Sequence, residues 1–321
     1  MKRDELGKKT PVVVIGGPTA SGKSALALAL AEEFRGTVIN ADAMQVYREL
    51  AILTARPTPA ETKRVPHRLY GVLSARVRCT AARWRTMALA AIAAAQRQER
   101  LPIVVGGTGL YLKALMEGLA PVPEIPPEVR NAARARHAEL GAQRFHAELA
   151  RLDPAMAKRL KPGDTQRLLR AWEVITATGR SLALFQKIPP ARAAQWFVPI
   201  RLLTPRDALY AACDERCRRM LAGGALEEVK ALLAMNLDSD LPAMKAVGVR
   251  ELATYLDGKA TREQALAKFQ QVTRNYAKRQ LTWFRHQMAE ARTWDAQFSE
   301  SVSEEIFSFI RKVIDPIKSS Q

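Results

Sequence analysis

Cysteines and long apolar runs are scarce in this sequence. Three cysteines occur among 321 residues, at Cys79, Cys213 and Cys217, and no two of them form a Cys-x-x-Cys pair. This number and spacing argue against a disulfide framework and against a structural zinc site. The longest run of small apolar residues, 88–95, is far shorter than the ~20 residues that a membrane helix needs. Residues 1–9 have no secretory pattern, so we expect a cytoplasmic protein that does not enter a membrane.

Acidic residues are too few to balance the basic ones. Asp and Glu number 32 against 50 Lys and Arg, which gives a net charge of +18. Such a surplus favours a polyanionic partner, either nucleic acid or an anionic membrane surface. A charge that merely keeps the protein soluble is the alternative, although a much smaller one would serve. Hydrophobic residues make up 48%, which is enough for a sizeable core and argues against a disordered chain.

Short β-branched runs alternate with helical patterns in the first third of the chain. Strands are expected over 11–16, 37–40 and 101–105, and helices over 22–35 and 81–98. Apolar runs of this kind that end in glycine or a small turn are typical of buried parallel strands. The alternation of strand and helix therefore predicts an α/β fold with a parallel sheet.

The pattern changes after Gly118. Prolines cluster in 119–127, and only helical patterns follow until a further strand is expected over 197–203. Prolines in such a cluster are typical of a linker or hinge. We therefore predict a helical insertion over 119–196 within the α/β core. This segment has 13 Lys and Arg against 7 Asp and Glu, a surplus of six positive charges.

The predicted core then consists of 10–118 and 197–295. Its second part contains helical patterns over 207–235, 242–257 and 262–292. Residues 296–321 have no strong motif, which predicts a loosely held tail.

A glycine-rich loop follows the first expected strand. Gly17-Pro-Thr-Ala-Ser-Gly22-Lys23-Ser24 has both glycines, the lysine and the hydroxyl of a P-loop. Glycines let backbone N–H groups turn toward phosphate oxygens, and the helix that follows presents its positive end to the anion. Lys23 adds a point charge, and Ser24 can hold magnesium, Mg²⁺. We therefore predict a P-loop NTPase-like core with a phosphate site at Gly17, Pro18, Thr19, Ala20, Ser21, Gly22, Lys23 and Ser24.

Asp42 follows the second expected strand. NTP hydrolases usually add a carboxylate after a further apolar strand, but the strand at 101–105 ends in Gly-Gly-Thr108-Gly without an acid. The carboxyl ends of parallel strands share one edge of a sheet, so Asp42 and Thr108 are expected near the phosphates. Asp42 is then a general base or a group close to Mg²⁺; the alternative is an ordinary turn or cap residue.

Six motifs together resemble the tRNA dimethylallyltransferase family, also called tRNA isopentenyltransferases. They occur in the family's order and cover about 11–290. They are Gly17–Ser24, Asp-Ala-Met-Gln-Val-Tyr at 42–47, Gly-Gly-Thr-Gly-Leu-Tyr-Leu at 106–112, Asp-Thr-Gln-Arg-Leu-Leu-Arg at 164–170, Lys-Ala-Val-Gly-Val-Arg-Glu at 245–251, and Lys-Arg-Gln-Leu-Thr-Trp-Phe-Arg at 278–285.

The resemblance implies a prenyl transfer. Dimethylallyl diphosphate would be the donor, and the acceptor would be the N6 amine of the adenosine immediately 3′ of the anticodon, in the anticodon stem-loop of tRNA. The P-loop would serve mainly the prenyl diphosphate, although in this family it is commonly described as an ATP site. We expect a monomer that acts on these substrates.

The same resemblance implies catalytic roles. Lys23, the loop amides and Mg²⁺ held by Ser24 would stabilise the charge on the leaving diphosphate. Arg216 would add a second cation, and its alternative role is a solvated helix charge. Asp42 would accept the N6 proton, and Thr108 would hydrogen-bond near Asp42 or the donor.

Contacts to tRNA are implied by the resemblance as well. Gln45 is the expected reader of the adenine edge, because an amide can pair bidentately with adenine; the alternative is a surface amide. The target base must leave its stack to reach a buried donor. The implied contacts are Asp42, Ala43, Met44, Gln45, Gln166, Arg167, Leu168, Leu169, Arg170, Lys245, Gly248, Arg250, Lys278, Arg279, Gln280, Trp283 and Arg285.

Three departures from the family pattern affect these expectations. Leu53 and Arg56 stand where the family usually has Gly and Lys, and Val249 replaces a usual Tyr. Leucine lacks the backbone freedom of glycine, which puts the geometry of the loop around Leu53 in question. The alternative functions are a small-molecule or nucleotide kinase with the same P-loop, and a non-catalytic RNA-binding protein. A kinase would not need the basic insertion, and the intact Lys23-Ser24 pair argues against the second.

Overall fold

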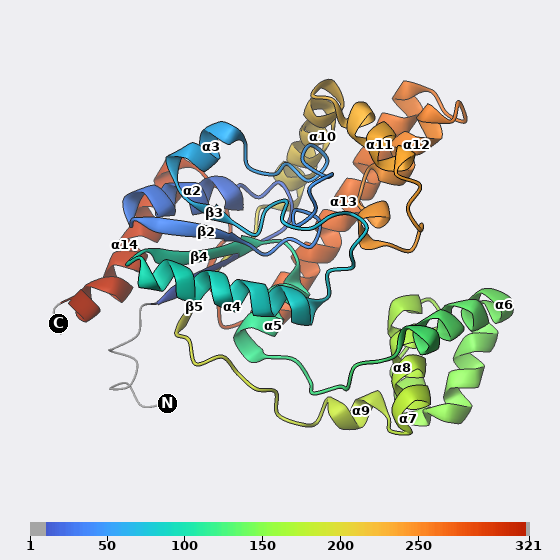
Figure 1. Ribbon diagram of the computed structural model, residues 1–321. Coiled ribbons are helices and arrows are strands. Elements are labelled where there is room, and N and C mark those ends of the chain that lie inside the picture. The colour runs from blue at the N-terminus through green and yellow to red at the C-terminus, as the bar shows by residue number, and fades with distance from the viewer. Residues whose placement is uncertain (1–10, 319–321) are drawn as a thin grey trace. The chain divides into compact units, whose positions relative to one another are not determined.

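The computed structural model describes residues 11–318, which form two compact units. One unit comprises 11–116 and 193–318, and the other comprises 117–192. Figure 1 labels most of the helices and strands. No helix among the described residues is long and apolar enough to cross a membrane.

The first unit is built on a six-stranded sheet in which every pair of neighbouring strands is parallel. The strand order is β3-β2-β4-β1-β5-β6, so β1 lies inside the sheet and is buried along its whole length. The strands are β1 (Val12–Gly16), β2 (Gly36–Asn40), β3 (His67–Arg68), β4 (Leu101–Gly106), β5 (Phe197–Leu202) and β6 (Arg292–Trp294). The predicted α/β fold with a parallel sheet is confirmed.

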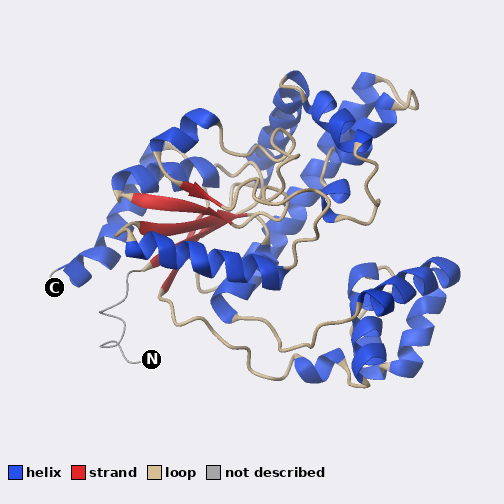
Figure 2. Cartoon of the chain, viewed as in Figure 1, coloured by secondary structure: helices blue, strands red, loops and turns tan. Residues whose placement is uncertain are grey.

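Helices cover both faces of this sheet (Figure 2). Successive strand side chains point to opposite faces, so Val13 and Ile15 pack in one apolar cluster and Val12 and Val14 in the other. The helices are α2 (Lys23–Glu33), α3 (Pro59–Arg64), α4 (Ala81–Arg97), α5 (Gly109–Glu117), α10 (Arg206–Ala222), α11 (Ala225–Ala234), α12 (Val249–Leu256), α13 (Arg262–Gln287) and α14 (Glu300–Lys318), with a 3₁₀ turn at Pro242–Lys245. The helix expected over 207–235 is divided into α10 and α11 by Gly223-Gly224.

The prediction of a loosely held tail over 296–321 is wrong for most of this segment. Residues 300–318 form α14, and its Ile306 and Ile310 are fully buried in the cluster that contains Val13 and Ile15. These two residues are four apart, so they lie on one face of the helix and pack toward the sheet. Just before α14, the backbone N–H of Phe298 donates to the Ser21 carbonyl of the glycine-rich loop at 3.3 Å.

The described residues of the second unit form helices and loops, with no strand. It contains α6 (Pro127–Leu152), α7 (Pro154–Ala157), α8 (Thr165–Thr178) and α9 (Leu182–Phe185). Gly141, at φ 70°, interrupts the helical backbone of α6. The unit has its own apolar core, in which Phe145, Leu149 and Leu168 are completely buried.

Candidate active site

The glycine-rich loop connects β1 to α2, as the sequence predicts. Gly22 precedes the first helical residue at φ 84°, a left-handed conformation that favours glycine. A side chain there would also meet Phe298, whose Cβ lies 2.6 Å from the position of an added Cβ. The Lys23 side chain lies along the loop and donates to the Pro18 carbonyl at 3.0 Å. The loop therefore presents its amides, the start of α2 and one ammonium to the same edge of the sheet.

Asp42 stands directly after β2, in a turn that its neighbour holds in place. The buried amide of Asn40 accepts from the Asp42 N–H at 2.8 Å and donates to the Asp42 carbonyl at 3.0 Å. Asp42 Oδ1 accepts from the Met44 N–H at 2.8 Å. One carboxylate oxygen of Asp42 therefore stabilises the turn. The other, Oδ2, has no hydrogen-bond partner within 11–318. That second oxygen is available as a proton acceptor.

Thr108 holds the same turn from the next strand. Its Oγ1 accepts from the Ala43 N–H at 2.9 Å, and its own N–H donates to the Ala41 carbonyl at 3.3 Å. The side chain therefore hydrogen-bonds beside Asp42, which is one of the two contacts expected of it.

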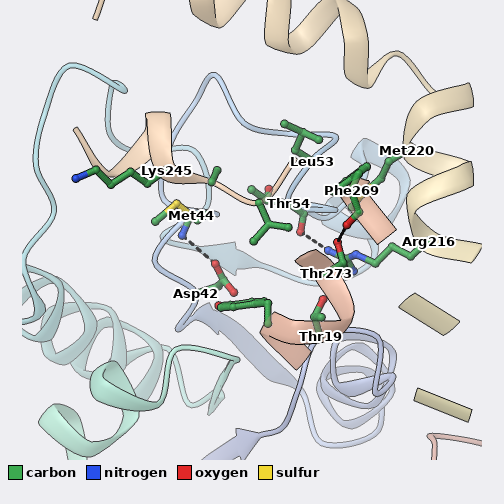
Figure 3. Close-up of a pocket in the computed structure, with 13 residues that line it drawn as sticks. Thr19, Asp42, Met44, Leu53, Thr54, Arg216, Met220, Lys245, Phe269 and Thr273 are labelled. Carbon is green, nitrogen blue, oxygen red and sulfur yellow. Dashed lines mark hydrogen bonds between the residues drawn. The ribbon is translucent and has the colours of Figure 1, made fainter. Parts of the chain in front are cut away.

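Two adjoining cavities occupy this edge of the sheet. The smaller, about 30 Å³, is mainly polar and contains Lys23, Ser24 and Tyr70 in its wall. The larger, about 160 Å³, is lined mostly by apolar side chains. Thr19, Asp42, Thr54 and Arg216 line both cavities. Figure 3 shows Asp42 and Arg216 at the larger cavity, coming from separate parts of the chain. Asp42 therefore faces the loop of Lys23 across one small space.

Two cations and one carboxylate determine the electrostatics of the polar cavity. Burial lowers the pKa of Lys23 to about 8, and Arg216 lowers it as well, whereas the charge of Asp42 raises it. Burial also lowers the pKa of Arg216, again opposed by Asp42. Arg216 donates through Nη2 to the Thr54 carbonyl at 3.0 Å and forms no ion pair with any carboxylate that the structure describes. Two cations against one carboxylate leave this cavity suited to an anion.

Burial raises the pKa of Tyr70 well above its usual value, and the nearby charge of Asp42 adds to the effect. The phenol therefore remains protonated in the wall of the polar cavity and can donate a hydrogen bond there. Sequence reasoning missed Tyr70, and also Asn40 and Thr54. Tyr70 precedes a glycine in a segment with no motif, and Thr54 contributes a backbone carbonyl, which no side-chain pattern reveals.

Gln45 is tied to the loop that contains Thr54. Its Nε2 donates to the carbonyls of Thr54 and Ala55, at 3.0 and 3.1 Å. Both amide hydrogens are thereby used, which leaves Oε1 as the group that can accept a hydrogen bond from a base. The bidentate pairing expected of Gln45 does not fit this arrangement.

Besides Gly248, two residues whose side chains were expected to contact tRNA are buried. Gln280 of α13 accepts from the Thr19 N–H at 2.8 Å and donates to the Gly107 carbonyl at 2.7 Å. It therefore joins the P-loop to the loop after β4. Leu168 is fully buried in the core of the helical unit. Their burial argues against the expected contacts of these two side chains with RNA.

The other expected contacts vary in exposure. Those that are exposed are Gln166, Arg167, Lys245, Arg250, Lys278, Arg279 and Arg285. Among them, Lys245 pairs with Asp240 at 2.8 Å. Those that are half-buried are Ala43, Met44, Leu169, Arg170 and Trp283, and the Trp283 ring lies directly against Gly109. Gly248 is buried at φ 101° at the start of α12, where its position beside Phe269 excludes a side chain.

The loop around Leu53 accommodates both departures. Leu53 is absent from the described residues with positive φ, so this position does not require glycine. Arg56 donates to the carbonyls of Tyr47 and Arg48, at 3.2 Å each. Val249 is buried, so it offers no surface to a partner.

Comparisons with known proteins agree on one family. The model of the IPP transferases matches residues 45–287, more than half of the chain. The tRNA dimethylallyltransferase of Rhodospirillum centenum is 58% identical over 289 residues, which are 89% of this chain and 91% of that protein. That of Paramagnetospirillum magneticum is 55% identical over 305 residues, 94% and 96% of the two chains.

Solved structures give the same result. The tRNA isopentenylpyrophosphate transferase of Bacillus halodurans matches with a TM-score of 0.71 at 32% identity, over 97% of this chain and 99% of that one. A eukaryotic dimethylallyltransferase acting on tRNA matches with a TM-score of 0.82 at 25% identity, over 96% of this chain and 80% of that one. The chain belongs to the family of IPP transferases, the tRNA dimethylallyltransferases.

Proposed function

We propose that this protein transfers a dimethylallyl group from dimethylallyl diphosphate to N6 of the adenosine immediately 3′ of the anticodon in tRNA. One observation supports this above all: Asp42, Lys23 and Arg216 line a single small polar cavity, next to a cavity with apolar walls. A proton acceptor, an anion site and a space for a hydrocarbon are what this alkylation requires.

The polar cavity is the proposed site of the diphosphate. The bond between the allylic carbon and the diphosphate oxygen breaks as the new bond to N6 forms, and negative charge develops on the leaving group. Lys23, Arg216 and the P-loop amides would stabilise this charge, and because they are fixed in advance they need not reorganise during the reaction. The Tyr70 hydroxyl would donate a further hydrogen bond in the same cavity.

Magnesium is the proposed cofactor. No group of three His, Cys, Asp or Glu side chains among the described residues forms a metal site. The exposed Ser24 hydroxyl in the wall of the polar cavity fits the P-loop arrangement, in which the protein supplies a hydroxyl and the substrate supplies oxygens. Bound there, Mg²⁺ would neutralise charge on the leaving group.

The prenyl group and the acceptor amine would both occupy the larger cavity. The apolar wall of this cavity, which includes Met44, Leu53, Met220 and Phe269, suits the five-carbon prenyl group because hydrocarbon is stabilised away from water. Asp42 Oδ2 would take the N6 proton as the new bond forms. The exposed cations of α8 and α13, Arg167, Lys278, Arg279 and Arg285, would contact tRNA phosphates.

The test combines purified protein, unmodified tRNA, Mg²⁺ and labelled dimethylallyl diphosphate. Label should enter the tRNA, and it should not enter a tRNA with guanosine in place of the target adenosine. Asp42→Asn keeps an oxygen for the Met44 N–H but removes the base, so transfer should fall by about 10²–10⁴-fold while tRNA affinity stays unchanged. ATP turnover with a small acceptor, without labelling of tRNA, would contradict the proposal and favour a kinase.

A further inference from the structure

The carboxylate of Glu228 is bound by three successive backbone N–H groups from a distant loop. The N–H groups of Ala51 and Ile52 donate to Oε2 at 2.7 and 2.8 Å, and that of Leu53 donates to Oε1 at 2.9 Å. Successive N–H groups that converge in this way form an anion site. Here the protein's own carboxylate, from the first turn of α11, fills that site.

The loop fixed by Glu228 carries an acceptor that both proposed substrate sites use. The Thr54 carbonyl accepts from Arg216 Nη2 at 3.0 Å and from Gln45 Nε2 at 3.0 Å. Thr54 lines both cavities, and Arg216 does so as well. Thr54 directly follows the three residues whose N–H groups bind Glu228. Its carbonyl therefore helps to determine where the Arg216 guanidinium lies.

Glu228 itself lines neither cavity. Any influence on the reaction must pass through the loop, and a carboxylate suits this task because each of its oxygens only accepts. A glutamine of the same shape would turn an amide NH₂ toward at least one backbone N–H. Two donors would then face each other, and the loss of at least one of the three hydrogen bonds would loosen the loop next to Thr54.

We propose that Glu228 is a positioning residue for prenyl transfer: it fixes the loop at 51–55, so that the Thr54 carbonyl holds Arg216 where the diphosphate leaves. This inference rests on the proposed function. It predicts that loss of the carboxylate slows the chemical step more than it weakens substrate binding.

The first experiment compares Glu228→Gln with Glu227→Gln. Both residues lie in the first turn of α11, and Glu227 is exposed, so the two variants lose the same charge at the same helix end. With both substrates saturating in a single turnover, Glu228→Gln should lower the transfer rate by about ten-fold or more, whereas Glu227→Gln should stay within about two-fold. Equal rates in the two variants would overturn the proposal.

A double-mutant cycle separates positioning from general stability. If Glu228 acts through Arg216, then Glu228→Gln should cost less than about three-fold in an Arg216→Ala background. Independent, multiplicative losses would overturn the inference, because a purely structural defect would lower the rate in either background. If Glu228→Gln melts below the assay temperature, Glu228→Asp, which keeps the charge on a shorter side chain, replaces it in the same cycle. A wild-type protein that transfers no label would refute the proposed function itself.

Discussion

Raising the pH should weaken the capture of dimethylallyl diphosphate. Burial lowers the pKa of Lys23 from 10.5 to about 8. A bound diphosphate favours the charged ammonium and so raises this pKa again. Below pH 8 the ammonium is already charged before binding. Above it, binding must take up a proton, so affinity falls as the pH rises until the pKa of the complex is reached.

The size of this effect follows from the interval between the two pKa values. Each pH unit in this interval lowers the affinity by at most ten-fold. If the diphosphate restores the pKa to 10.5 from about 8, the total decrease approaches about 300-fold. This is an upper limit, because Lys23 is only partly buried and retains some contact with water.

The quantity to measure is kcat/KM for dimethylallyl diphosphate at saturating tRNA, between about pH 6.5 and 9.5. The donor's own last phosphate ionisation has a pKa of about 6, so it cannot cause a decline on the alkaline side. Lys23→Arg is the matched control, since arginine stays charged throughout and its profile should lack the alkaline decline. A flat wild-type profile to pH 9.5 would refute the reasoning. A decline shared by Lys23→Arg would assign it to another group.

Three further changes test other parts of the structure. Ile310→Ala should lower the free energy of unfolding by about 2–5 kcal/mol, as measured by denaturant titration, because Ile310 is fully buried; an unchanged stability would mean that α14 does not pack on the sheet. Arg167→Ala should weaken tRNA binding and reduce its salt slope by about one, with kcat unchanged, and an unaltered slope would argue against a phosphate contact. Asn40→Asp turns an oxygen toward the carbonyls of Asp42 and Leu69, which the amide now binds at 3.0 Å each. Transfer should therefore slow, and a normal rate would show that the turn of Asp42 does not need this amide.

The inner strands were predictable and the edge strands were not. The runs at 11–16, 37–40 and 101–105 correspond to β1, β2 and β4, and 197–203 corresponds to β5. The runs of β1, β2 and β4 stand out because these strands are buried along their whole length, whereas β5 alternates between half-buried and buried residues. In contrast, β3 and β6 have two and three residues, and a pattern with a period of two residues cannot be recognised in so short a segment.

Helix α14 had a sequence signal that was not used. Ile306, Ile310 and Val313 recur at helical spacing in a segment that also contains charged residues. The segment lies beyond the last functional motif, but its apolar periodicity predicts a helix that packs on the sheet.

The sequence predicted the charged residues of the site better than the uncharged polar residues that fix its loops in place. The glycine-rich loop indicated Lys23, the end of the second strand indicated Asp42, and only the family resemblance indicated Arg216; the structure brings all three to one cavity. Gln280 was misassigned because a glutamine among basic residues normally indicates an exposed surface. An amide both donates and accepts, so it can also join two loops inside a fold, and that use depends on partners that are far away in the sequence.

Three loops meet at the polar cavity, and one polar side chain holds each. Gln280 bonds the P-loop at Thr19, Asn40 bonds the turn of Asp42, and Glu228 bonds the loop that carries Thr54. None of these three side chains bears the charge that would meet the substrate. Their effect is to fix the groups that do, and fixed groups stabilise developing charge without reorganising.

This division of roles has a consequence for mutational data. Affinity for tRNA would come mainly from exposed cations such as Arg167 and Lys278, because phosphate contacts dominate nucleic-acid binding. The rate of transfer would instead depend on how precisely the three loops meet. Because the two sets of residues do not overlap, substitutions in one set should change kcat while tRNA affinity is kept, and substitutions in the other should do the reverse. A residue that changed both equally would have to act on the fold as a whole, and its melting temperature would reveal this.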